Sequence, residues 1–311
     1  MGEEQSKDGV ARAVAALRAG GLVILPTETV YGLAADAGNP RAVAAVFEAK
    51  GRPSFNPLIA HVADLAAARR IARFDERAER LAAAFWPGPL TLVLPVADPR
   101  AVSELARAGL DTVAVRAPAH PLARELLLDF GGPIVAPSAN RSGRPSPTTF
   151  ADAVEETGQA AAAALDGGPC PVGLESTVVA LLDDARLLRP GAVTRAQIEA
   201  LIGPLSEAEA DAKRSPGRLA RHYAPEAPVR LEAGAPERDE AYLAFGPAPA
   251  GARVWNLSPG RDLREAAANL FAFLREADRS GAAAIAVAPI PHEGLGEAIN
   301  DRLKRAAGFV G

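Results

Sequence analysis

The sequence of 311 residues contains one cysteine and few aromatic residues, which make up 5% of the chain. A single cysteine cannot form a disulfide within the chain, so a disulfide-stabilised fold is excluded. Cys170 stands in the stretch GGPCPVG without a cluster of cysteine or histidine residues around it. We therefore interpret it as a structural or incidental residue rather than a catalytic thiol.

The chain also lacks an excess of charge of one sign, since 34 basic and 38 acidic residues give a net charge of −4. This balance gives no support for broad binding to nucleic acids or membranes, although a local basic patch remains possible. No apolar run approaches the length of a membrane span. The polar start, MGEEQSKDGVARAV, lacks the apolar segment of a signal peptide. We expect a cytoplasmic protein that does not bind membranes.

Several common functional motifs are missing as well. The sequence contains no Walker P-loop, no GxGxxG and no HExxH motif. The prolines of GGPCPVG remove backbone donors that a phosphate-binding nest would need. Ser138 does not lie in a GxSxG motif, which argues against a serine–histidine hydrolase.

Hydrophobic residues make up 49% of the chain, and their pattern alternates between strands and helices over residues 1–203. Such alternation predicts an α/β fold, a sheet covered by helices. The pair of short strands 176–182 and 185–191 predicts a hairpin, and hence a mixed sheet. Helix caps are predicted at Asp8, Asn39, Thr194 and Asp262. Helices are predicted over 9–20, 41–50, 64–73, 76–85, 120–130 and 194–203, and strands over 22–25, 57–62, 87–96, 112–118 and 133–140.

The composition changes between residues 204 and 228, a stretch with four prolines and no long apolar run. This stretch is typical of a linker. Strands over 229–234, 241–246, 252–257 and 283–290, with helices over 262–281 and 294–308, then predict a second, smaller α/β unit. We predict a catalytic domain over 1–207, a linker over 208–228 and a small α/β domain over 229–311.

The stretch LPTETVYGL, residues 25–33, places hydroxyl groups at every second position. Thr27, Thr29 and Tyr31 would share one face if this stretch were a strand. Such a row predicts either a capped turn or one wall of a polar pocket.

Polar residues also collect at the predicted ends of strands, where open α/β sheets build ligand sites. Four of them are cationic, which suggests an anionic substrate, because arginine suits phosphate or carboxylate oxygens and lysine acts as a point charge. Three of the polar residues have an ordinary alternative: Lys50 as a helix C-cap, Arg52 as a solvated side chain and His61 as a structural residue. The residues are Thr27, Thr29, Lys50, Arg52, His61, Arg116, Ser138, Asn140, Ser176 and Arg189.

Six segments in a fixed order make the sequence similar to a known family: LPTETVYGLAADA, KGRPSFNPLIAHV, WPGPLTLVLP, VAVRAPAHP, APSANRSGRPSPT and ESTVVAL…LLRPGAV. Together they closely resemble the YrdC/Sua5 family, the threonylcarbamoyl-AMP synthases. The resemblance covers residues 8–203. The linker motif SPGRLARHYAPEAP and the unit after it resemble the two-domain Sua5 form, whose second domain is expected to be Rossmann-like.

The resemblance implies an enzyme, a nucleotidyltransferase that joins L-threonine, bicarbonate or CO2, and ATP into L-threonylcarbamoyladenylate with release of pyrophosphate. This is the first step of t6A modification at position 37 of tRNA, and other proteins then transfer the product to tRNA. Mg2+ is expected with ATP, held mainly by phosphates and water rather than by protein ligands. Direct tRNA binding is not predicted.

The resemblance also implies roles for individual residues. Lys50 and Arg52 would be catalytic. L-threonine would be held by Thr29, His61, Arg116 and Ser176. ATP would be held by Lys50, Arg52, Asn56, Thr112, Ser138, Asn140, Ser146, Arg189, His222 and Tyr223.

The predicted linker carries several cations together with His222 and Tyr223. It is interpreted either as a solvated basic tether or as a lid that closes over the nucleotide.

Two alternatives to the enzyme remain: a carbamoyl-transfer protein, like the related module of hydrogenase-maturation proteins, and an RNA-binding protein. The absence of zinc-finger and acylphosphatase-like segments weighs against the first, and the acidic balance weighs against the second.

Overall fold

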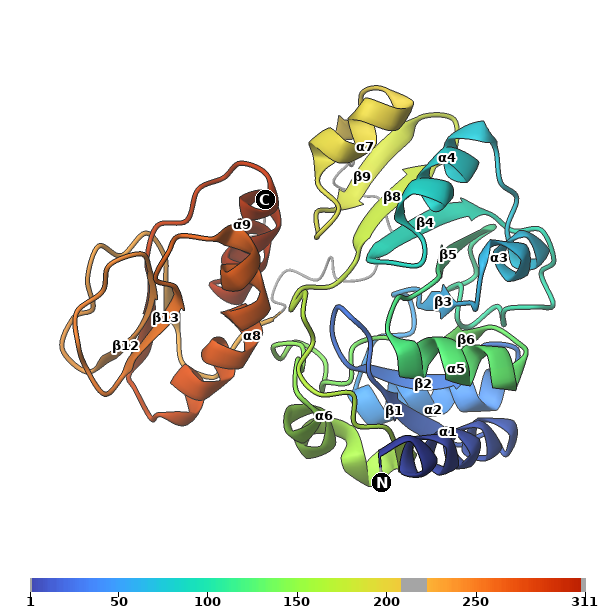
Figure 1. The fold of residues 1–311 in the computed structure, drawn as a ribbon, viewed down its shortest axis with the longest axis horizontal. Coiled ribbons are helices and arrows are strands. Elements are labelled where there is room, and N and C mark those ends of the chain that lie inside the picture. The colour runs from blue at the N-terminus through green and yellow to red at the C-terminus, as the bar shows by residue number, and fades with distance from the viewer. Residues whose placement is uncertain (1, 208–222, 309–311) are drawn as a thin grey trace.

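The structure is a computed structural model that describes residues 2–207 and 223–308. A ten-stranded mixed sheet dominates the larger part, and a four-stranded sheet forms the smaller part (Figure 1). This arrangement confirms the predicted fold class. The exact domain limits stay a prediction, and residues 208–222, which hold most of the predicted linker or lid, lie outside the described residues.

The larger part alternates strands and helices along most of its length. Its helices are α1 Gly2–Arg18, α2 Pro40–Lys50, α3 Leu65–Ile71, α4 Glu76–Phe85, α5 Pro121–Phe130, α6 Phe150–Thr157 and α7 Arg195–Ile202. Its strands are β1 Leu22–Leu25, β2 Gly32–Asp36, β3 Ile59–His61, β4 Leu90–Pro95, β5 Thr112–Arg116, β6 Ile134–Val135, β7 Ala161–Ala164, β8 Thr177–Leu181, β9 Ala185–Arg189 and β10 Ser206–Glu207.

Both faces of the large sheet are covered, and strand β1 shows how. Its alternate residues point to opposite faces: Ile24 belongs to one core cluster with Val43 of α2, and Leu25 belongs to another with Leu17 of α1. A strand that is buried on both faces has no polar side, which explains the uninterrupted sequence LVIL.

Cap residues end or begin several helices as predicted. The Asn39 side chain accepts hydrogen bonds at the start of α2, and Gly51 ends this helix with a positive φ of 57°. Thr194 forms a capping box with Gln197 at the start of α7. The prediction for Asp8 is wrong, because α1 begins six residues earlier, at Gly2, and Asp8 lies inside the helix.

The smaller part is a parallel sheet in the order β11-β14-β12-β13, with two long helices. Its core contains Leu270 of α8 and Ile299 of α9, and it also includes Val30 and Leu174 of the larger part. In Figure 1, α8 and α9 lie on the side of this sheet that faces the larger part. The elements are β11 Val229–Arg230, β12 Glu240–Phe245, β13 Val254–Ser258, α8 Leu263–Arg279, β14 Ala284–Val287 and α9 Leu295–Ala306.

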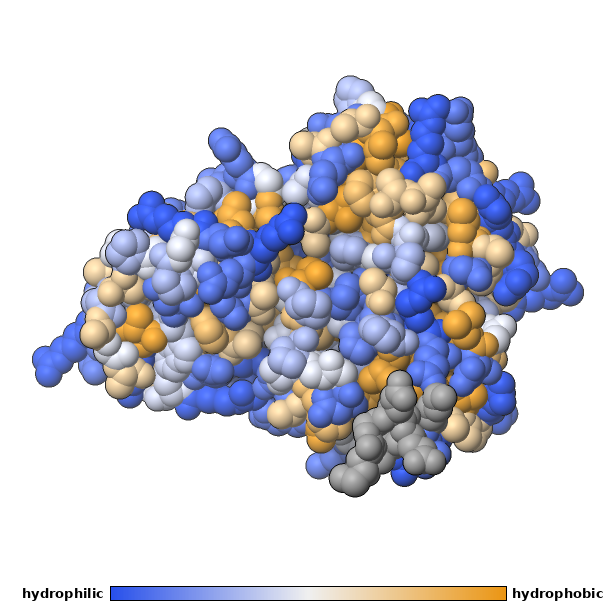
Figure 2. All heavy atoms as spheres, viewed as in Figure 1, coloured by the Kyte–Doolittle hydropathy of each residue, from blue (hydrophilic) through white to orange (hydrophobic). Residues whose placement is uncertain are grey.

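Ion pairs join the two parts in addition to this apolar contact. Arg275 of α8 lies 3.0 Å from Glu156 of α6, and both side chains are almost fully buried. Arg279 pairs with Asp152 at 2.6 Å, and Arg195 pairs with Glu297 at 3.1 Å. On the face shown in Figure 2, hydrophobic residues occur in small groups among hydrophilic ones. Within residues 2–207 and 223–308, no helix combines the length and apolar character needed to cross a membrane.

Candidate active site

The topology of the large sheet gathers several predicted site residues at one edge. Strands β3 and β5 are parallel, and His61 and Arg116, their last residues, lie opposite each other in register. Strand β4 is antiparallel to β5 and parallel to β8, and β9 is antiparallel to β8. The two reversals cancel, so β9 runs in the same direction as β5. Arg189 therefore ends at the same edge, and Ser176 directly precedes β8 there.

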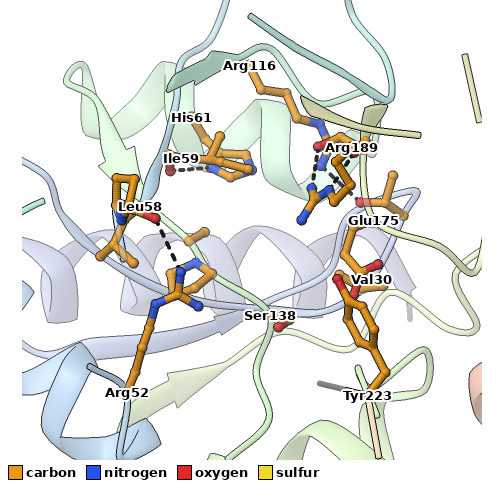
Figure 3. Close-up of a pocket in the computed structure, with 15 residues that line it drawn as sticks. Val30, Arg52, Leu58, Ile59, His61, Arg116, Ser138, Glu175, Arg189 and Tyr223 are labelled. Atoms are coloured by element: carbon orange, nitrogen blue, oxygen red, sulfur yellow. Dashed lines mark hydrogen bonds between the residues drawn. The ribbon is translucent and has the colours of Figure 1, made fainter. Parts of the chain in front are cut away.

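A cavity that is partly open to solvent lies at this edge. Figure 3 shows Arg52 and Tyr223 reaching it from opposite sides, with His61 and Arg116 beyond them. Eight of the predicted residues line the cavity: Thr29, Arg52, His61, Arg116, Ser138, Ser176, Arg189 and Tyr223.

Arg116 is held in place on three sides. Its Nε donates to the Gly88 carbonyl at 3.1 Å, Nη1 donates to the Thr29 hydroxyl at 2.9 Å, and Nη2 pairs with Glu28 at 2.5 Å. A guanidinium carries five N–H groups, so among the described residues one N–H on each Nη is left for a ligand. Two such groups can bind a carboxylate bidentately.

Glu28 is the residue that fixes this arginine, and it was not predicted. Its other carboxylate oxygen accepts a 2.9 Å hydrogen bond from the Ala119 backbone. Burial alone raises the pKa of Glu28, but the charge and hydrogen bond of Arg116 outweigh burial and lower the pKa below its ordinary value. Glu28 is therefore an ionised partner that neutralises part of the charge of Arg116.

His61 is a neutral hydrogen-bonding group in this site. Burial first, and Arg116 second, lower its pKa to about 3. Its Nδ1 lies 3.1 Å from the Ile59 carbonyl, which can only accept, so Nδ1 carries the proton. The other nitrogen, Nε2, is then an acceptor. A histidine with this pKa is too weakly basic to remove a proton from an amine near neutral pH.

Ser176 and Arg189 form a second bonded group. The Ser176 hydroxyl lies 2.7 Å from that of Thr91, and Arg189 donates to the carbonyl and the hydroxyl of Ser176 at 3.1 and 3.2 Å. These contacts position the guanidinium of Arg189 at the cavity while leaving other donors for an anion.

Glu175 lines the cavity beside Ser176, and sequence reasoning missed it too. Ser146 donates to one of its carboxylate oxygens, and Arg302 of α9 donates to the other at 2.8 Å. Burial raises the pKa of Glu175, but Arg302 and then Arg189 outweigh burial and lower it to about 2. The carboxylate is therefore ionised over the whole neutral range.

Lys50 is buried and does not line the cavity. Its Nζ donates to the carbonyl oxygens of Ser138 and Asn140 and so ties the SAN loop to the end of α2. Burial first, and Arg52 second, place the pKa of Lys50 well below its ordinary value. Arg52 is anchored by the Pro57 carbonyl at 3.2 Å and does line the cavity.

Of the three hydroxyls in LPTETVYGL, only two lie together: those of Thr27 and Thr29 are 2.8 Å apart. Residues 27–31 form a turn, in which the Thr27 hydroxyl accepts from the backbone of Thr29 and Val30 at 3.2 Å. Tyr31 points elsewhere and donates to the Gly168 carbonyl at 2.7 Å. Both interpretations of the stretch thus hold in part: Thr27 caps the turn and Thr29 lines the cavity.

Several predicted residues lie away from the cavity lining. Asn140 is buried, and its amide nitrogen donates to the carbonyls of Arg141 and Arg144. Ser146 contacts Glu175, and Asn56 offers its backbone carbonyl to Arg52 at 3.5 Å. These three residues support the wall, so their predicted contact with ATP stays a prediction. His222 lies outside the described residues.

Thr112 is clearly separate from this site. It is the first residue of β5, at the strand end opposite Arg116, and it lines a different cavity with Asp111 and Asp183. Its position gives no support to the predicted contact with ATP.

Cys170 is buried, and burial raises the pKa of its thiol to about 12, which suits a structural rather than a reactive cysteine. No group of three or more histidine, cysteine, aspartate or glutamate residues in the described part of the chain could hold a metal ion.

Fold and site together define a class: an α/β protein whose mixed sheet ends in a cavity with fixed cations, hydroxyls and a neutral histidine. Two family models match the chain. The Sua5/YciO/YrdC model, described as "Telomere recombination", matches residues 15–191, and a model described as "Threonylcarbamoyl-AMP synthase, C-terminal domain" matches residues 193–308. The chain belongs to the Sua5/YciO/YrdC family.

Relatives match over nearly the whole chain. A threonylcarbamoyl-AMP synthase of Bacillus subtilis is 43% identical, with 96% of this chain and 93% of the relative covered. One of Pyrococcus abyssi is 40% identical, with 94% and 92% covered. The crystal structure of P. abyssi Sua5 complexed with L-threonine superimposes with a TM-score of 0.90, at 39% identity, over 96% of this chain and 94% of that chain. These matches confirm the family predicted from the sequence.

Proposed function

We propose that this protein catalyses the synthesis of L-threonylcarbamoyladenylate from L-threonine, bicarbonate or CO2, and ATP. The observation that carries this proposal is the shared cavity. Residues assigned to threonine, namely Thr29, His61, Arg116 and Ser176, line the same space as Arg52, Ser138 and Arg189, which are assigned to ATP. The activity named for the relatives, and the threonine bound in P. abyssi Sua5, support it.

The threonine end of the cavity is the end with His61 and Arg116. The two free N–H groups of Arg116 would grip the threonine carboxylate. The acceptor nitrogen of His61 would receive a hydrogen bond from the threonine hydroxyl or its amine. Because His61 stays neutral, it does not repel the threonine amine when this amine is protonated.

The reaction joins two anions. The uncharged amine of threonine adds to CO2 and releases a proton, which gives a carbamate. A carbamate oxygen attacks the α-phosphorus of ATP, the bond from this phosphorus to the bridging oxygen breaks, and pyrophosphate leaves. Fixed cations lower the repulsion between the reactants, and orientation of the two groups contributes several kcal/mol.

The nucleotide end contains Arg52 and Arg189, whose guanidinium groups suit phosphate oxygens. Lys50 would act indirectly: it holds the loop Ser138–Asn140 through two backbone carbonyls and would not touch ATP itself. This assignment moves Lys50 from a reacting to a supporting role. Catalysis then depends on positioning and electrostatics, without a covalent enzyme intermediate.

Mg2+ is expected to enter with ATP. Among the residues that the structure describes, Glu175 is the one carboxylate that lines the cavity, and it is engaged by Ser146 and Arg302, so these residues do not offer a cage of protein ligands. Mg2+ would neutralise phosphate charge while bound to phosphates and water. The product would pass to the proteins that modify adenosine 37 of tRNA, and no tRNA contact by this chain is part of the proposal.

The experiment measures pyrophosphate release by the pure protein with ATP, bicarbonate and single amino acids. Release should require both L-threonine and bicarbonate, and mass spectrometry should detect L-threonylcarbamoyladenylate. Release that is independent of threonine would contradict the proposal. So would carbamoyl transfer or tight, salt-sensitive RNA binding in the absence of any adenylate.

A further inference from the structure

The smaller part of the molecule supports one wall of the cavity. Val30 and Glu175 line the cavity, and Val30 and Leu174 both belong to the hydrophobic core of the smaller part. Gly173 has a φ of 74°, and a Cβ atom there would lie 2.4 Å from the Ala267 carbonyl oxygen of α8. The segment that leads to Glu175 is therefore packed directly on the backbone of α8.

A charged contact accompanies this packing. Arg302 of α9 is fully buried and donates from Nε to Glu175 at 2.8 Å. Its Nη1 pairs with Asp301 at 2.7 Å, and its guanidinium carbon lies 5.4 Å from the centre of the Tyr223 ring. Tyr223 lines the cavity and also packs on Phe271 of α8, with ring centres 5.3 Å apart. One arginine of the smaller part thus contacts two residues of the cavity wall.

Glu175 lies between competing cations. Arg302 faces it from α9, Arg189 faces it from β9, and Lys50 interacts with it from α2. Tyr223 also interacts with Glu175, and Asp301 shares Arg302 with it. In the structure Arg302 and Ser146 occupy the carboxylate, while Arg189 donates to Ser176 instead. Arg189 is thereby held at the cavity by Ser176, and Arg302 takes its place as the hydrogen-bonded partner of Glu175.

We propose that Arg302 is a positioning residue of the nucleotide site, which neutralises and holds Glu175 so that Arg189 stays available to the phosphates of ATP. This inference rests on the function proposed above. It gives the smaller part of the molecule a definite purpose, because α9 supplies the cation that pairs with Glu175. Arg302 acts through Glu175 and Arg189 and does not touch the substrates.

The physical reason is the cost of a buried charge without a partner. If Arg302 is removed, Glu175 remains in a buried wall and faces the polyphosphate as an uncompensated anion. Arg189 is then the strongest remaining cation beside it and moves toward it. Both effects weaken the binding of ATP. Removing the charge of Glu175 as well abolishes both effects.

The test compares Arg302→Met, Arg302→Gln and the double variant Arg302→Met/Glu175→Gln. Calorimetry measures the Kd of ATP with Mg2+, without threonine or bicarbonate, at a temperature where every variant is folded. Arg302→Met should raise this Kd by about 10- to 100-fold, the range found when residues that orient metal ligands are lost. The double variant should return it to within about fivefold of wild type, because a buried pair is best removed as a pair. If Arg302→Met does not fold, Arg302→Gln replaces it, and the same increase in the Kd of ATP is expected.

Arg305→Met is the matched control. Arg305 also lies on α9 and pairs with Asp301 at 3.0 Å, whereas among the described residues it is Arg302 that pairs with Glu175. Its Kd for ATP should equal that of the wild-type protein. A purely structural role of Arg302 would lower the Tm of Arg302→Met and leave the Kd of the folded protein unchanged, and that result would overturn the inference. A double variant as weak as Arg302→Met would overturn it too.

Failure of the inference and failure of the proposed function can be distinguished. Binding of ATP is measured without turnover, so a wild-type Kd in Arg302→Met counts against the positioning role alone. Absence of threonine-dependent pyrophosphate release in the wild-type protein counts against the proposed function, whatever the variants bind.

Discussion

Arg116 has a structural role, and the proposed function also gives it a role in binding threonine; a pair of substitutions can separate the two. Arg116→Met removes the hydrogen bonds to Gly88 and Thr29 and leaves Glu28 buried without its cation. Breaking a buried ion pair from one side costs about 3–5 kcal/mol. At about 2.1 cal/mol/K of unfolding entropy per residue, a chain of 311 residues loses about 1.5 °C of Tm per kcal/mol, so the Tm should fall by roughly 5–8 °C.

The effect on threonine is separate. Two charge-assisted hydrogen bonds to the carboxylate, at about 1.5–3 kcal/mol each, predict a KM for threonine raised at least 100-fold, since about 1.4 kcal/mol corresponds to a factor of ten. Adding Glu28→Gln removes the uncompensated charge and should restore most of the Tm. It cannot restore the KM, because no guanidinium is present to bind the carboxylate.

The assay combines thermal unfolding followed by circular dichroism with pyrophosphate release at varied threonine concentration. Arg69→Met is the control, since Arg69 forms a bidentate pair with Glu79 at 2.7 Å but is largely exposed. An exposed pair contributes about 0–1 kcal/mol, so both Tm and KM should hardly change. If Arg116→Met/Glu28→Gln recovers the wild-type KM together with the Tm, Arg116 does not bind threonine and the reasoning is refuted.

Three further predictions concern other residues. The folded pKa of His61, about 3, lies below the unfolded value of about 6.5, so its contribution to stability is complete above pH 6.5 and is lost as the pH falls toward 3. Chemical unfolding of His61→Gln should therefore show about 1.6 kcal/mol less loss of stability between pH 6.5 and pH 5 than wild type, because the slope rises from half of 1.36 kcal/mol per pH unit at pH 6.5 to nearly all of it at pH 5; equal losses would mean that His61 is not buried as a neutral group. Gly173→Ala should lower stability by more than about 2 kcal/mol, because its φ of 74° is strained for alanine and the new Cβ meets α8; an unchanged Tm would contradict the close contact. Thr112→Val should leave the KM for ATP unchanged, because Thr112 lies at the far end of β5; a KM raised tenfold would return Thr112 to the site.

Sequence reasoning located the part of the site that depends on strand ends. His61, Arg116 and Arg189 end strands that run the same way, and this rule requires only the hydrophobic pattern and the order of strands. Caps such as Asn39 were predictable for a similar reason, since a cap acts on the three residues that follow it.

Residues whose role depends on a distant partner were not predictable in this way. Glu28 and Arg116 are 88 residues apart, and Glu175 and Arg302 are 127 residues apart. A pattern with a period of two or 3.6 residues carries no information about such pairs. One signal was present: each glutamate stands alone beside a hydroxyl residue in an otherwise apolar segment, and a buried carboxylate requires a cation.

The LPTETVYGL stretch failed for a local reason. The alternation of hydroxyls was treated as the period of a strand, but Pro26 and the hydrogen bonds of Thr27 to the following backbone favour a turn. In a turn, unlike a strand, alternate side chains do not share a face. Thr29 therefore reaches the cavity and Tyr31 does not. The chemistry of the stretch was recognised, whereas its geometry was not.

A crystal structure with L-threonine and a non-hydrolysable ATP analogue tests the central claim most directly. It should show the threonine carboxylate on Arg116 and the phosphates on Arg52 and Arg189, with the amine of threonine facing the α-phosphorus inside one cavity. Threonine and nucleotide bound in separate cavities, or phosphates that leave both arginines untouched, would contradict the claim.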